Sequence, residues 1–177
     1  MMLMPRIRTS VWFFALLVVL TVLAIGIPYV YNLRHLLKPE DVEAAQRRWA
    51  ENGPADYDLI WREKLEEKGS EPAITVYFVE VRGGKLIGLK LGDEAIDLKR
   101  LSPQRREEFT VPGLLGRIAR ELNDDLNSGE RRNYMTAYFD PKTGCPFRYV
   151  RRSREAKSRL EWTVKLKQER DTPEEAR

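Results

Sequence analysis

The chain has 177 residues, with 31 lysines and arginines against 27 aspartates and glutamates, and a formal net charge of +4. Hydrophobic residues make up 42% of it and charged residues 33%, a composition that excludes a wholly disordered polypeptide. The single cysteine, Cys145, excludes an internal disulfide framework and a cysteine-based structural zinc site.

Residues 11–31 form an apolar run without a charged side chain. A bilayer core of about 30 Å needs about 20 apolar residues in a helix, because every backbone polar group must be paired within the segment. The run therefore predicts a single transmembrane helix over 11–31. A basic flank over 1–10 precedes it, and a juxtamembrane linker over 32–38 follows it.

A cleaved signal peptide is the alternative reading of the same segment. Arg6 and Arg8 would form its basic end, and Ala24 and Gly26 would place small residues before the cut. The apolar stretch continues to Tyr31, past the usual length of a signal peptide, which favours an uncleaved anchor.

The charges that flank the run set its orientation only weakly. Arg6 and Arg8 on one side are nearly balanced by Arg34 and Lys38 on the other. We expect the N-terminus inside the cell and the following domain outside the cytoplasmic membrane.

The first part of the domain reads as a helix followed by strands. Pro39 suits the first turn of a helix over 38–51, and alternating apolar residues predict a strand over 57–65. Residues 73–81 and 85–91 predict a hairpin, because Gly83 and Gly84 between them suit a two-residue turn. A short extended piece over 95–98 and a polar segment over 99–108 follow.

The second part begins with a helix and ends with strands. Thr110 is the expected N-cap of a helix whose apolar residues, from Leu114 to Leu126, recur on one face. Strands are expected over 133–139, 147–152 and 160–167, and residues 171–177 read as a disordered tail. The predicted fold is one α+β domain over 39–170, an antiparallel sheet of about six strands with two helices on one face.

The reactive side chains in the sequence do not predict a catalytic, cofactor or metal site. Asp140 opens a hairpin loop whose Asp-Pro-Lys-Thr-Gly sequence resembles a phosphorylation motif of ion pumps but carries an inserted proline. Cys145 has no histidine beside it in the sequence, since the only one is His35 near the predicted membrane span. We therefore expect Cys145 to be a small turn or core residue, and we expect no cofactor.

The basic excess lies in the C-terminal part. Between residues 131 and 170 there are twelve lysines and arginines against four acidic residues. A patch of them could bind anionic lipid head groups or a polyanion. No nucleic-acid recognition motif accompanies the charge, so nucleic acid is not an expected partner. The candidate patch consists of Arg148, Arg151, Arg152, Arg154, Lys157 and Arg159.

Five short patterns follow one another in the domain: Arg-Trp-Ala-Glu-Asn-Gly-Pro-Ala-Asp-Tyr-Asp over 48–58, Val-Arg-Gly-Gly-Lys over 81–85, Thr-Val-Pro-Gly-Leu-Leu over 110–115, Tyr-Phe-Asp over 138–140 and Gly-Cys-Pro over 144–146. In this order they resemble a bacterial family of small exported or membrane-anchored domains of unknown function. The resemblance implies export and an α+β fold. It carries over no catalytic residue.

These observations predict a membrane-tethered, non-enzymatic domain that binds or supports a protein partner at the outer face of the bacterial cytoplasmic membrane. An exposed apolar or aromatic patch beside the solvated face of the sheet would favour this function. The tyrosines that could belong to such a patch, if they lie outside the core, are Tyr77, Tyr134, Tyr138 and Tyr149. A basic module that binds anionic lipid or a polyanion is the alternative, and an enzyme without a recognisable motif is a third reading.

Overall fold

The computed structural model describes residues 7–34, 36–128, 133–153 and 155–167, and within 7–34 it describes the side chains of 12–26 only. The chain divides into two units, Met1–Leu36 and Leu37–Arg177, which are described separately. The predicted flank over 1–10 lies largely outside the described residues, and the predicted tail over 171–177 lies wholly outside them.

The first unit is a single helix, α1 (Ile7–Arg34), of 28 residues. Its large apolar side chains from Trp12 to Ile25 are all exposed. No helix of the described residues combines the length and the hydropathy that a membrane crossing requires.

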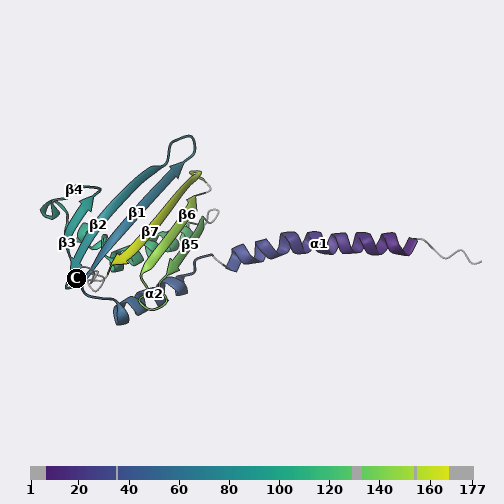
Figure 1. Ribbon diagram of the computed structural model, residues 1–177, viewed down its shortest axis with the longest axis horizontal. Helices are drawn as coiled ribbons and strands as arrows, with labels where there is room; N and C mark the ends of the chain where they lie inside the picture. Colours follow the sequence, from purple (N-terminus) through teal and green to yellow (C-terminus); the bar gives the residue numbers. More distant parts are fainter. Residues whose placement is uncertain (1–6, 35, 129–132, 154, 168–177) are drawn as a thin grey trace, which may run out of the picture. The chain divides into compact units, whose positions relative to one another are not determined.

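The second unit is built on one antiparallel sheet of seven strands in the order β4-β3-β2-β1-β7-β6-β5 (Figure 1). The α+β class is confirmed, and the number of strands is seven where about six were expected. The strands are β1 (Tyr57–Glu67), β2 (Ala73–Arg82), β3 (Lys85–Leu91), β4 (Glu94–Ala95), β5 (Tyr134–Phe139), β6 (Pro146–Ser153) and β7 (Ser158–Lys167).

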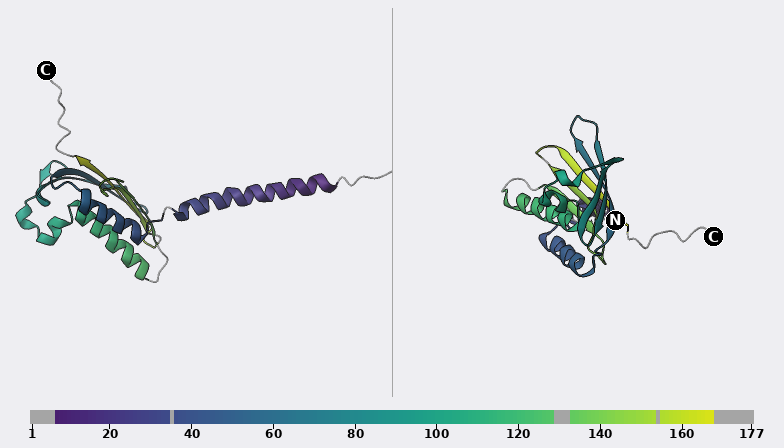
Figure 2. Two further views of the ribbon diagram at one scale, coloured as in Figure 1. Left: turned by 90° about the horizontal axis from the view of Figure 1, so that it is seen from below. Right: turned by 90° about the vertical axis from the view of Figure 1, so that its left-hand side faces the viewer.

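Two helices, α2 (Pro39–Asn52) and α4 (Val111–Asn127), lie side by side against one face of the curved sheet (Figure 2). We call this face the covered face and the opposite one the open face. The prediction of two helices on one face is confirmed for this pair. Between β4 and α4 the polar segment expected over 99–108 contains a 3-10 helix, η1 (Leu98–Arg100), and a short helix, α3 (Pro103–Glu107).

Periodicity explains why α4 forms and how it packs. Leu114, Leu115, Ile118 and Leu122 recur on one helical face and are all buried. The Thr110 side chain accepts a hydrogen bond from the Gly113 N–H, so the predicted N-cap is confirmed. Leu126 was expected to continue the stripe, but it is 37% exposed.

The core lies between these helices and the covered face. Its largest buried residues are aromatic: Trp61 and Trp162 have ring centroids 5.5 Å apart, and Tyr149 lies 4.7 Å from Trp162. The Val111 backbone N–H donates to the Tyr57 hydroxyl at 3.1 Å, which pairs a free N–H group at the start of α4. Aromatic side chains on neighbouring strands therefore bind the helix layer to the sheet.

The outer edges of the sheet are partly covered. Strand β4 has only two residues. On the β5 edge, the Leu37 N–H donates to the Met135 carbonyl at 2.9 Å, and the Asp125 carboxylate accepts from the Asn133 N–H at 3.0 Å. Such shielding is the usual protection against pairing with another chain.

The β5–β6 hairpin packs its tip against α2. Gly144 has a φ of +78°, and a Cβ at this position would overlap the Ala45 carbonyl oxygen. Gly69 has a φ of +89° and open space around it. The two glycines therefore share a backbone conformation and differ in packing.

Replacing Gly144 with alanine should lower the free energy of unfolding by about 3 kcal/mol, because both the left-handed backbone and the close contact with α2 oppose a side chain. Gly69→Ala, the matched control, should cost only the conformational part, about 1 kcal/mol. Urea unfolding of the full chain, followed by tryptophan fluorescence, measures both. Equal losses for the two variants would contradict the close packing.

Candidate functional site

The pairing registers assign each strand residue to one face of the sheet. Side chains of β1, β2, β3, β6 and β7 place ten basic and four acidic residues on the open face. The basic ones are Arg62, Lys64, Arg82, Lys85, Lys90, Arg148, Arg152, Arg159, Lys165 and Lys167, and the acidic ones are Asp58, Glu66, Glu80 and Glu161.

The structure divides the basic patch that the sequence suggests. Arg148, Arg152 and Arg159 lie on the open face, whereas Arg151 lies opposite Leu160 on the covered face. Lys157 is exposed in the β6–β7 turn at a φ of 48°. Arg154 lies outside the described residues. The alternation of side chains along β6 separates Arg151 from its sequence neighbours.

Two of the arginines are held by acidic neighbours. Arg148 contacts Glu161 at 2.8 Å, and Arg159 contacts the same carboxylate at 2.6 Å. Arg159 also lies 3.9 Å from Glu66, which pairs with Lys64 at 2.6 Å. Because their charge is already paired, these arginines are less available to an external anion than the sequence suggests.

Other basic side chains on the open face make no ion pair within the described part of the chain. The Arg152 guanidinium lies 5.7 Å from the centre of the Tyr134 ring, which is a cation–π contact. The remaining side chains of this kind are Arg62, Lys85, Lys90, Lys165 and Lys167. The available positive charge therefore lies mainly on lysines that the sequence patch did not include.

The open face also carries apolar side chains. Ile74, Val76 and Phe78 lie on alternate positions of β2, with Ile60 of β1 opposite Phe78 and Ile87 of β3 at the adjacent bulge. Ile74 is 50% exposed, Phe78 40% and Ile87 53%. We call these five residues the β2 strip. The strip borders a hollow of about 310 Å³, whose lining includes Phe78, Ile60, Lys90 and Lys167.

The tyrosines expected near the surface divide between core and exterior. Tyr149 is fully buried and donates to Glu121 at 2.8 Å, so it lies in the core and is not a contact residue. Tyr77 is half-buried against Trp61 and Phe109. Tyr134 is half-buried beneath Arg152.

Tyr138 is the one of the four that is well exposed. It is 42% exposed and pairs with Phe147, itself 47% exposed, at a ring distance of 6.0 Å. The two rings form an aromatic pair on the β5–β6 hairpin.

A charged network fixes α4 to the covered face. Arg117 lies 4.5 Å from the Trp162 ring centre and contacts Glu121 at 2.9 Å and Glu63 at 3.7 Å. Glu121 also accepts the Tyr149 hydroxyl. Burial and then the Glu121 charge raise the pKa of Tyr149, which keeps this hydroxyl protonated as a donor.

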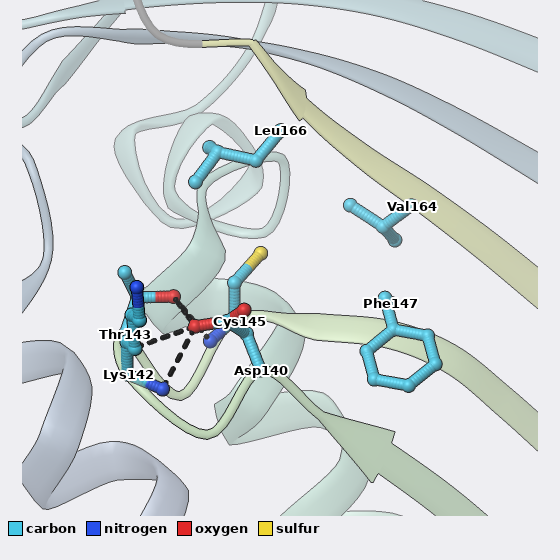
Figure 3. A pocket seen from close by; sticks show the side chains of 7 residues that line it. All are labelled: Asp140, Lys142, Thr143, Cys145, Phe147, Val164 and Leu166. Atoms are coloured by element: carbon cyan, nitrogen blue, oxygen red, sulfur yellow. Dashed lines mark hydrogen bonds between the residues drawn. The ribbon is translucent and has the colours of Figure 1, made fainter.

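The loop that resembles a phosphorylation motif is a tight hairpin turn. Asp140 accepts hydrogen bonds from the Thr143 N–H at 2.7 Å, the Thr143 hydroxyl at 3.0 Å and the Lys142 N–H at 3.0 Å (Figure 3). These bonds hold the pKa of Asp140 below its ordinary value. One oxygen of the carboxylate accepts all three bonds, which is the structural role expected of Asp140 in the turn.

Cys145 follows this turn and is 4% exposed, which confirms it as a core residue. Burial, and then the negative charge of Asp140, raise the pKa of its thiol from 9.0 to about 12. A thiol that stays protonated at neutral pH is a poor nucleophile. Among the described residues, no group of three potential ligands could hold a metal ion.

A cavity of about 540 Å³ lies beside Cys145. Its lining combines an apolar side with a polar rim from the hairpin turn (Figure 3). The lining residues are Asp140, Lys142, Thr143, Cys145, Phe147, Val164 and Leu166. Sequence reasoning did not find this cavity, because it depends on where two strands separate.

The raised pKa of Cys145 predicts a pH dependence of stability. Below pH 9 the thiol keeps its proton in both states and contributes nothing. Between pH 9 and about 12 only the unfolded state releases the proton, so the free energy of unfolding falls by about 1.4 kcal/mol per pH unit.

Urea unfolding from pH 8 to pH 11 tests this, with Cys145→Ala as the control that lacks the thiol. The stability of the native chain should fall more steeply than that of the variant above pH 9. Parallel stability curves would contradict a buried, protonated thiol.

No protein-family model, curated protein or solved structure matches the chain. The resemblance to small exported or membrane-anchored domains therefore stays a prediction from the residue patterns.

Proposed function

We propose that this chain is a membrane-tethered, non-enzymatic domain that binds a protein partner at the outer face of the bacterial cytoplasmic membrane. The observation that carries the proposal is the β2 strip, an exposed apolar stripe on the helix-free face of the sheet. The open face of an antiparallel sheet is normally polar, so adjacent aliphatic and aromatic side chains exposed on it favour a contact surface.

The apolar run over 11–31 supports the tether. No helix of the described residues meets the length and hydropathy of a membrane crossing, so the tether is inferred from the sequence of 11–31, which carries no charged side chain over about the 20 residues that a bilayer core requires. The exposed side chains of α1 include Trp12 at 74% and Ile25 at 68%, and burying such apolar surface away from water is favourable.

The mixed charge around the strip favours a protein over a lipid surface as the partner. Asp58 and Glu80 line the same hollow as Phe78, Lys90 and Lys167. Anionic head groups would repel these two carboxylates, whereas a protein can place basic groups against them and acidic groups against the lysines. We infer a partner with an apolar centre and a rim of both charges.

The states of the reactive side chains support a role without catalysis. The Cys145 thiol is protonated and buried, and one oxygen of the Asp140 carboxylate accepts three hydrogen bonds within the hairpin turn. Glu63 and Glu121 on the covered face are bridged by Arg117. Each of these groups has a structural partner.

A photoreactive amino acid at position 78, in the full chain in intact cells, should cross-link one discrete protein. The same amino acid at position 126, where Leu126 is also an exposed apolar residue but lies on α4, serves as the matched control. Ile74→Ser should lower the yield from position 78 about tenfold, since it removes a neighbouring apolar contact. Equal yields from both positions, or lipid adducts alone, would contradict the proposal.

A second candidate, suggested by the ten basic residues on the open face, is binding to anionic lipid or a polyanion. If this is the function, each basic residue without an ion pair should contribute about 1 kcal/mol to the binding free energy near an anionic surface. The basic residues that already form ion pairs should contribute less. Full-length protein in neutral nanodiscs should then float with anionic vesicles at low salt and not with neutral ones.

The triple variant Arg152→Gln, Lys165→Gln, Lys167→Gln should abolish this flotation, and Arg148→Gln with Arg159→Gln should weaken it less. Unchanged flotation of both variants would exclude the candidate patch as the binding surface.

A further inference from the structure

Strand β7 has neighbours of unequal length on its two sides. It pairs with β1 through Lys167, but its pairing with β6 ends at Thr163, opposite Arg148. Within the described part of the chain, residues 164–167 therefore have a strand neighbour on the β1 side only. Their other side is an open stretch of sheet edge inside the seven-stranded sheet.

The sequence explains why the ladder ends there. Strand β6 begins at Pro146, which has no backbone N–H to donate to a neighbouring strand. A register shift between Tyr138 and Phe139 bends the partner strand at the same level. Gly144 then brings the hairpin tip against Ala45 of α2, away from the line of the sheet.

The separation of the strands produces the cavity of about 540 Å³ described above, and we call it the notch. Val164 and Leu166 border it from β7, and Cys145 and Phe147 border it from the hairpin (Figure 3). The volume lies within the range of about 300–1,000 Å³ that is typical of ligand sites.

The two faces of the notch differ in chemistry. Val164 and Leu166 point to the covered face, where the Cys145 sulfur also lies. Lys165 and Lys167 alternate with them and point to the open face, and Lys142 and the acidic Asp140 both line the rim. None of these three lysines makes an ion pair with a described residue.

We propose that the notch binds an extended segment of a partner protein, which adds to β7 as a strand and carries apolar and acidic residues in alternation. Alternate residues of an antiparallel strand direct their N–H and C=O groups to opposite sides, so two of the residues 164–167 present these groups to the notch, along about 13 Å of strand at 3.3 Å per residue. Alternate side chains of the segment then face the apolar pocket and the lysines. The charge on the open face selects acidic residues at those positions.

Residues 164–167 are less protected than the β4 and β5 edges of the sheet, and this difference favours a binding role for the notch. The protein shields the β5 edge with Leu37 and Asp125 and shortens β4 to two residues. In the described part of the chain, residues 164–167 have a strand neighbour on one side only, and an apolar pocket lies on their other side. This proposal does not rely on the β2 strip, because the notch and the β2 strip have no residue in common.

The test uses the full chain in neutral nanodiscs and a fluorescent peptide of three Val-Glu repeats. We expect binding with a Kd below about 1 mM, and slower hydrogen exchange at the amides of 164–167 when the peptide is present. A peptide with N-methylated amides on one edge should bind at least tenfold more weakly, because it cannot form the strand. A Val-Lys peptide should not bind.

Variants locate the site. Lys165→Glu with Lys167→Glu should weaken binding of the Val-Glu peptide about tenfold, and Phe147→Ser should weaken it as well. Lys68→Glu and Leu126→Ser, exposed basic and apolar residues away from the notch and the β2 strip, should leave it unchanged.

Three results would overturn the proposal. They are no binding at about 1 mM, equal binding of the N-methylated peptide, and binding that appears only after deletion of 168–177, which would make the chain's own tail the occupant. If the peptide fails while position 78 still cross-links a protein, the notch proposal alone is lost.

Discussion

The apolar stripe of α4 decides which face of the sheet is buried, and the rest of the structure follows from that choice. Leu114, Leu115, Ile118 and Leu122 need an apolar surface, and the covered face supplies Trp61, Trp162 and Tyr149. Because side chains alternate along each strand, burying one set of residues exposes the other. The open face therefore collects the basic residues and the β2 strip by the same constraint that builds the core.

The sequence predicted the elements whose signals are local. Alternation in β7, the glycine pair between β2 and β3, and the Thr110 cap all depend on neighbouring residues, and the structure agrees with each. The short helix α3 was missed because Ser102 and Pro103 begin it within a polar segment without apolar periodicity. Residues 95–98 were expected to be extended, but the strand ends at Ala95 and a 3-10 turn follows.

The surfaces were harder to predict because they depend on pairing between distant residues. Arg148, Arg151 and Arg159 are close in sequence, yet the register places Arg151 on the opposite face and brings Glu161 and Glu66 to the other two. The notch depends on where β6 stops pairing with β7, a point marked only by Pro146. A proline at a strand start is common, so its meaning appears only when the longer pairing of β1 with β7 is known.

A tether changes what such surfaces need in order to function. The β2 strip has five residues and the notch is lined by seven, whereas a stable protein–protein interface has about 20–30 residues on each side. If residues 11–31 hold the domain at a membrane that also holds its partner, the effective concentration rises, and two weak contacts on one partner reinforce each other. Modest affinity at each surface is then sufficient, and it leaves binding reversible. The exposed strand edge at residues 164–167 suits such weak and reversible binding. Backbone hydrogen bonds give geometric specificity there without a large apolar area, which would promote aggregation.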